Sequence, residues 1–145
     1  MIDYKSDLIV NKPVAQVFAF VADVARMDDW TEMSGTHLVS GQALGLGSQI
    51  QTTMKMGPSK QTMIFEVSAF EPNRRISWNT SSKGSLQWDA DYLFEPVGAG
   101  TTRVTSSGTI RLTGTLKLME GMMSGEIRKG EAKELEKFKE LVEKM

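Results

Sequence analysis

The chain has 145 residues, no cysteine and a formal net charge of −1, with 17 basic and 18 acidic residues interspersed. A chain of this length forms one domain, residues 1–145, with room for a real hydrophobic core. The even mixture of charges offers no basic footprint for a nucleic acid, and the lack of cysteine excludes disulfides, thiolate nucleophiles and cysteine-based metal sites.

The first part of the chain predicts a strand followed by two short helices. Residues 2–10 alternate between apolar and polar side chains, which indicates a strand. Asn11 is a good helix N-cap and Pro13 suits a first helical turn, and apolar residues at positions 14, 17, 18 and 21 follow helical spacing. Asp23 is expected to cap a second short helix that ends near Trp30.

The middle of the chain predicts six further strands in a sequential antiparallel meander, because the gaps between alternating segments are of hairpin length. In residues 85–95, the cleanest alternation, every second side chain from Leu86 to Phe94 is apolar and those between are mainly polar. The expected strands cover residues 36–40, 49–56, 61–70, 75–80, 85–95 and 101–112.

From Gly114 to Met145 the apolar period changes to 3.6, which predicts one long amphipathic helix. Such a helix buries its apolar stripe against the apolar face of an antiparallel sheet. We therefore predict an α+β fold in which a curved, seven-stranded antiparallel sheet surrounds a long C-terminal helix, with two short helices after the first strand. A hydrophobic chamber between sheet and helix is the expected functional site.

Several local motifs add a resemblance to a known superfamily. They are residues 11–18 at the first helix, Asp23 seven residues before Trp30, Phe70-Glu71-Pro72-Asn73-Arg74-Arg75-Ile76 at a strand turn, Gly100-Thr101-Thr102-Arg103-Val104-Thr105 entering the last strand, and the C-terminal helix. In this order, over essentially the whole chain, they resemble the START-like, or SRPBCC, superfamily, which includes the polyketide cyclase/dehydrase and lipid-transport family. The resemblance implies a helix-grip fold that hosts carriers, cyclases and co-chaperone-like modules.

The candidate ligand-binding residues are bulky or small side chains at predicted inward positions. Aromatic rings would stack on a planar ligand, and unbranched methionines adapt to irregular apolar partners, although both types also fill ordinary cores. Small residues either leave room for a ligand or accommodate Trp78 or Trp88. The predicted site residues are Trp30, Met54, Met56, Phe65, Trp78, Trp88, Tyr92, Ser106, Gly108, Met119, Met123 and Ile127.

The sequence offers few candidate residues for acid–base catalysis or metal binding. His37 is the single histidine, has no visible triad partner, and is interpreted as a strand-edge residue. Glu134 falls inside the apolar stripe of the last helix, so it either turns toward solvent or is a buried carboxylate with a raised pKa. Residues 41–47 are glycine-rich but lack the Lys-Ser/Thr of a phosphate loop. We assign no catalytic residue, metal or cofactor.

The leading functional interpretation is binding or transport of a small hydrophobic or amphipathic ligand. A cyclase/dehydrase-like enzyme and a protein-interaction module are the alternatives. No run approaches the ~20 apolar residues of a membrane span, and the first residues lack the apolar region of a secretory signal. We therefore expect a cytoplasmic monomer or homodimer whose partner is a small hydrophobic molecule, with no nucleic acid and no membrane span.

Overall fold

The computed structural model describes residues 1–39, 43–56, 59–80 and 86–145, except the side chains of residues 56, 59 and 115. The elements follow one another as β1 (Ile2–Val10), α1 (Val14–Val21), the 3₁₀ turn η1 (Val24–Arg26), α2 (Met27–Trp30), β2 (Met33–Leu38), β3 (Gln49–Met56), β4 (Ser59–Glu71), β5 (Arg75–Thr80), β6 (Leu86–Gly98), β7 (Thr101–Leu112), the 3₁₀ segment η2 (Gly114–Met119) and α3 (Glu120–Glu143).

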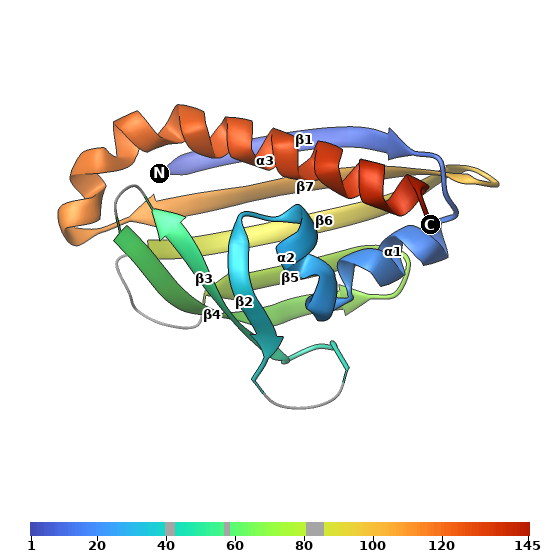
Figure 1. Cartoon of the computed structure of the whole chain (residues 1–145), viewed down its shortest axis with the longest axis horizontal. Coiled ribbons are helices and arrows are strands. Elements are labelled where there is room, and N and C mark those ends of the chain that lie inside the picture. The colour runs from blue at the N-terminus through green and yellow to red at the C-terminus, as the bar shows by residue number, and fades with distance from the viewer. Residues whose placement is uncertain (40–42, 57–58, 81–85) are drawn as a thin grey trace.

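The seven strands form one antiparallel sheet in the order β1-β7-β6-β5-β4-β3-β2. The register shifts within β4–β5, between Val67 and Ala69, and within β2–β3, between Ser34 and His37; such irregularities bend and twist strands. Figure 1 shows α3 lying along one face of this sheet, over β1 and β7, while β2 and β3, at the opposite edge of the strand order, slant across the lower strands. The α+β helix-grip prediction is confirmed.

The core lies between the inner face of the sheet and the helices. On β6 the side chains at alternate positions from Leu86 to Phe94 are buried, as the alternation predicts. Trp30 of α2 links this face to α3, because its ring lies 6.0 Å from that of Tyr92 and 5.2 Å from that of Phe138, between centroids. These aromatic contacts lie between sheet and helix, where the sequence leads us to expect a chamber.

Two boundary predictions are wrong for local backbone reasons. The long α-helix begins at Glu120 instead of Gly114, because Gly114 has a φ of +64° and a 3₁₀ segment precedes the α-helix. Asn11 does not cap α1; Pro13 occupies the N-cap position, and the Asn11 backbone N–H donates to Glu143 Oε2 at 2.7 Å.

Other boundaries shift by a few residues. β2 begins at Met33 instead of residue 36, and Ser40 lies outside the described residues. β4 already includes Ser59, so only residues 57 and 58 of the predicted turn remain between β3 and β4, and both are outside the described residues. In the described part of the chain, no helix is both long enough and apolar enough to cross a membrane.

Candidate functional site

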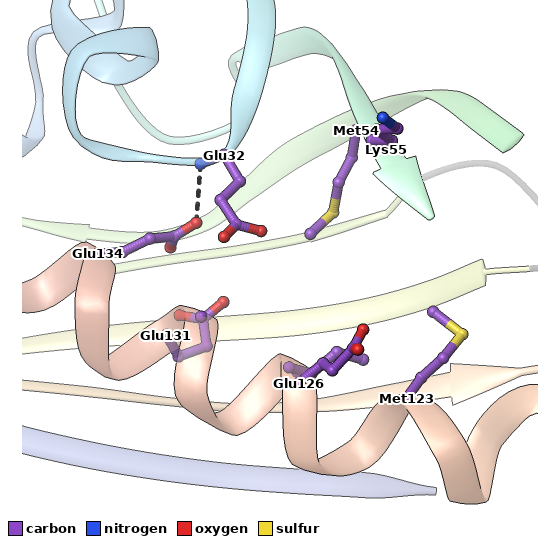
Figure 2. A pocket seen from close by; sticks show the side chains of 9 residues that line it. Glu32, Met54, Lys55, Met123, Glu126, Glu131 and Glu134 are labelled. Carbon is purple, nitrogen blue, oxygen red and sulfur yellow. Dashed lines mark hydrogen bonds between the residues drawn. The ribbon is translucent and has the colours of Figure 1, made fainter. Parts of the chain in front are cut away.

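A small pocket lies between the first half of α3, the end of β3 and the segment that joins α2 to β2 (Figure 2). Its volume is about 70 Å³. A buried cavity of about 150 Å³ holds benzene, so this pocket has room only for a smaller group. The lining residues are Glu32, Met54, Lys55, Met123, Glu126, Ile127, Gly130, Glu131 and Glu134.

The pocket interrupts the apolar stripe of α3. Ile127, Glu131, Glu134 and Phe138 follow one another at intervals of three or four residues, which places them on the same face of a helix. Ile127 and Phe138 are apolar, as this face requires, whereas the two glutamates between them bring carboxyl groups under the sheet. The face is therefore apolar at both ends and polar in the middle.

Both glutamates are buried. Glu131 is 5% exposed and Glu134 is 7% exposed. The Glu134 carboxylate accepts a hydrogen bond from the Glu32 backbone N–H at 2.9 Å, whereas in the described part of the chain no hydrogen bond or ion pair reaches the Glu131 carboxyl. Figure 2 shows the carboxyl groups of Glu32, Glu131 and Glu134 facing the same space. Of the two interpretations of Glu134, the buried carboxyl is the one observed.

Burial makes these two carboxyl groups weaker acids than an exposed glutamate. Burial raises the pKa of Glu131 above its ordinary value of 4.5, and the carboxyls of Glu134 and Glu32 raise it further. Burial also raises the pKa of Glu134, although the hydrogen bond from Glu32 offsets part of that effect. A protonated carboxyl donates one hydrogen bond and still accepts others, so this pair can bind a polar ligand group or deliver a proton.

Two buried tyrosines continue the polar region into the core. Trp88 Nε1 donates a hydrogen bond to the Tyr4 hydroxyl at 2.8 Å, and Tyr92 is hydrogen-bonded to Ser106. Burial raises the pKa of both tyrosines, and the nearby Glu131 carboxyl is the next cause for each. Both phenols are therefore neutral at ordinary pH and serve as hydrogen-bonding groups.

The structure brings together only some of the predicted site residues. Met54, Met123 and Ile127 line the pocket, and Met119 is half-buried at the end of η2. The Met56 side chain lies outside the described residues. The remaining large or polar predicted residues are buried in the core: Trp30, Phe65, Trp78, Trp88, Tyr92 and Ser106.

Gly108 accommodates a large neighbour. A Cβ atom at this position would collide with the Tyr4 side chain and would lie 2.5 Å from the Asp89 carbonyl oxygen. The small residue therefore serves to accommodate a bulky side chain, which is Tyr4 instead of the Trp78 or Trp88 considered from the sequence. The inner side of Gly108 is filled by protein.

Sequence reasoning missed most of the polar lining of the pocket. Glu131 had a usable signal, since it lies four residues after Ile127 on the apolar stripe. Glu32, Lys55 and Glu126 carry no such signal, because each is exposed and reaches the pocket only through the fold. Gly130 allows the Glu32 carboxyl to lie close to α3, because even a Cβ atom at this position would be 3.5 Å from Glu32 Oε1.

The other residue considered for catalysis, His37, lies outside the pocket. His37 is exposed on β2, and its Nδ1 atom lies 2.8 Å from the Gly35 carbonyl oxygen. Considering residues 1–39, 43–56, 59–80 and 86–145 alone, no three histidine, aspartate or glutamate side chains come together as a metal-binding group.

Comparison with known proteins identifies the family. A sequence model of the family described as polyketide cyclase/dehydrase and lipid transport matches residues 1–143. The chain belongs to this family. No curated protein matches its sequence. Family membership, together with the START-like fold, supports a ligand-binding or cyclase-like role.

Solved structures share the fold at low sequence identity. The protein TTHA0849 from Thermus thermophilus is 16% identical, with 97% of this chain and 96% of that chain covered and a TM-score of 0.81. A START superfamily protein from Mycobacterium smegmatis is 17% identical, with coverages of 97% and 98% and a TM-score of 0.78. The ZhuI aromatase/cyclase from Streptomyces sp. R1128 is 13% identical, with coverages of 97% and 93% and a TM-score of 0.78. At these identities the likeness establishes the fold alone.

Proposed function

We propose that this protein binds a small amphipathic molecule, with part of the ligand in the pocket between α3 and β3. The observation that carries the proposal is the combination of an apolar rim with a buried, unpaired carboxyl. Met54, Met123 and Ile127 provide the apolar surface, and Glu131 and Glu134 provide the polar end. Ligand sites commonly combine mainly apolar walls with a few convergent polar groups.

The size of the pocket limits what enters it. At about 70 Å³, it takes one end of the ligand, while the rest lies along the rim formed by Met54 and Met123. Methionine side chains adapt to apolar partners of different shapes, so the rim tolerates variation in that outer portion. The proposal therefore concerns a compact polar end group attached to a short apolar chain.

Gly130 offers a direct test, because it lines the pocket and carries no side chain. Titration with 1-hexanol, followed by NMR of ¹³C-methyl methionine, should shift the Met54 and Met123 signals saturably in the natural protein. Gly130→Leu should abolish the shifts by filling the pocket. Gly121→Leu is the matched control, because a Cβ atom at Gly121 meets nothing within 4 Å. Equal saturable shifts in a folded Gly130→Leu variant would contradict the proposal.

A second candidate function is acid–base catalysis of the cyclase/dehydrase type. It is favoured by the raised pKa values of Glu131 and Glu134, since perturbed carboxyls in a pocket are candidates for general acids and bases. Loss of water from a β-hydroxy ketone requires removal of an α-proton by a carboxylate and protonation of the departing hydroxyl by a carboxylic acid. Two neighbouring carboxyls with one proton between them supply both groups.

Dehydration of 4-hydroxypentan-2-one to a conjugated enone, followed by ultraviolet absorbance, tests this second function. Loss of a general acid or base typically lowers a rate by about 10²–10⁴-fold, so Glu131→Gln should have an effect of this size. Glu136→Gln, an exposed position on the same helix, should leave the rate unchanged. If the natural protein binds the ketone but does not dehydrate it, the catalytic proposal is contradicted and ligand binding is the function that stands.

A further inference from the structure

The charges around the pocket are unbalanced. Four carboxyl groups line it, from Glu32, Glu126, Glu131 and Glu134, against the single ammonium group of Lys55. Lys55 is exposed at the end of β3, and no ion pair joins it to any of these glutamates among the described residues. The pocket therefore has a surplus of carboxyl groups over cationic groups.

Glu131 is the carboxyl of the pocket for which the described residues supply no hydrogen bond. It is 5% exposed and lines the pocket, yet its carboxyl has no hydrogen bond in the described part of the chain. Figure 2 shows it pointing from α3 toward the space beneath Glu32 and Met54. Polar groups of largely buried residues usually have partners, and the Glu131 carboxyl faces the pocket, so its partner is expected to be a group that enters the pocket.

We infer that the ligand of this pocket carries a primary ammonium group, which lies among the carboxyls of Glu131, Glu134 and Glu32. The inference rests on the proposed function, because it specifies the polar end of the same ligand. The ammonium has three N–H donors, so it can donate to more than one of the carboxyl groups that face the same space from α3 and from the segment before β2. A short alkyl portion then contacts Met54, Met123 and Ile127 at the rim.

The same geometry disfavours other ligand classes. A carboxylate or phosphate entering the pocket would add a negative charge beside carboxyl groups in a region of low dielectric, where repulsion is strong. A neutral hydroxyl or carbonyl would form a hydrogen bond with a carboxyl but would gain no attraction from its ionised form. The exposed carboxyls of Glu32 and Glu126 at the mouth attract a cation during approach and repel an anion.

Binding of an ammonium has a measurable protonic consequence. In the empty pocket, burial and mutual repulsion raise the pKa of Glu131 and of Glu134. A cation between the two carboxyls favours their ionised forms and so lowers both pKa values. The complex therefore releases protons to the buffer, whereas a neutral ligand with the same alkyl chain releases none.

Three probes with a common chain test the inference: hexylamine, 1-hexanol and hexanoate. Isothermal titration calorimetry at pH 7.0, in two buffers of different ionisation enthalpy, measures both affinity and protons released. Hexylamine should bind at least tenfold more tightly than 1-hexanol and should release protons, and hexanoate should bind most weakly. Glu131→Gln should reduce the preference for the amine and the proton release, while Glu136→Gln, on the exposed face of α3, should change neither.

The outcomes separate this inference from the function on which it rests. Equal affinities for hexylamine and 1-hexanol, or tighter binding of hexanoate, would overturn the ammonium inference and leave ligand binding intact. An amine preference that survives in Glu131→Gln without loss of proton release would also overturn it, because the cation would then lie elsewhere. Failure of all three probes to bind the natural protein would overturn both proposals. Glu131→Gln preserves side-chain shape, and its fold is checked by circular dichroism.

Discussion

The two halves of α3 use one helical face in different ways. In the second half, Leu135, Phe138 and Val142 are buried, and the Phe138 ring packs against Phe20 and Trp30 with centroids 5.5 and 5.2 Å apart. In the first half, Met123 and Ile127 meet a pocket instead of a packed ring. Glu131 and Glu134 lie at the junction of the two regions. The apolar stripe thus packs against aromatic rings where it is continuous and borders a pocket where carboxyl groups interrupt it.

The largest effect expected from this comparison concerns packing. Phe138→Ala should lower the free energy of unfolding by about 3–5 kcal/mol, because it leaves a cavity among closely packed aromatic rings. Met123→Ala should cost less than about 2 kcal/mol, because its side chain already borders an open space. Urea denaturation of the two variants measures the difference. Equal losses would show that both halves are equally well packed.

The two glutamates at the junction of the halves should make the free energy of unfolding depend on pH. The folded protein holds the protons of Glu131 and Glu134 more tightly than the unfolded chain, since burial raises both pKa values above 4.5. Above about pH 4.5 the folded state therefore binds more protons, and the free energy of unfolding falls as pH rises through neutrality. Glu131→Gln should reduce this slope and raise stability at pH 8 by about 1 kcal/mol or more.

Thermal unfolding between pH 5 and pH 8 provides the measurement, with Glu136→Gln as the exposed control. A natural protein that is more stable at pH 8 than at pH 5 would contradict the assignment of buried, proton-holding carboxyls. The same result in Glu131→Gln and in the natural protein would place the titrating group elsewhere.

A smaller effect distinguishes the glycines of the first half. Gly130→Ala and Gly121→Ala should each stabilise α3 by up to about 1 kcal/mol, because glycine is a poor helix former. Only Gly130→Ala should weaken binding of 1-hexanol, since its new methyl group lies about 3.5 Å from Glu32 Oε1 at the pocket wall. Thermal melts combined with the NMR titration separate the two consequences. Identical binding by the two variants would place the ligand away from Gly130.

The subtlest expected difference is in local opening. The first half of α3 contains Gly121 and Gly125, each with open space around the position of a Cβ atom, whereas the second half is anchored by buried side chains. Amide hydrogen exchange should therefore be faster over residues 120–127 than over residues 131–142. Equally slow exchange in both segments would show that the glycines do not loosen the first half of α3.

Much of the fold was predictable because alternation and helical periodicity are strong signals. The bounds of β1, β3, β5 and β7 agree with the predicted ranges, and Trp88 and Tyr92 lie on the inner face. Helix starts were less predictable. Whether the residues after Gly114 form a 3₁₀ or an α-helical turn depends on how the chain leaves β7. The two kinds of helix place apolar side chains at similar intervals, so the sequence pattern does not distinguish them.

The candidate site was only partly predictable. Met54, Met123 and Ile127 could be identified because inward apolar positions follow from periodicity. The carboxyl cluster could not be assembled in this way, since Glu32 approaches Glu134 across 102 positions of sequence. Gly108 shows the opposite problem: its small size is visible in the sequence, but the side chain that occupies the space, Tyr4, belongs to a strand at the other end of the chain.

The pairing of β1 with β7 also affects how the chain folds during synthesis. Ile2 pairs with Ile110 and Val10 with Thr102, so β1 acquires its strand partner only after nearly all of the sheet has emerged from the ribosome. Contacts this distant in sequence raise the relative contact order, which slows folding. Until then β1 is an unpaired strand that can associate with other nascent chains. The translation time between residues 10 and 112 is thus the interval during which aggregation competes with folding.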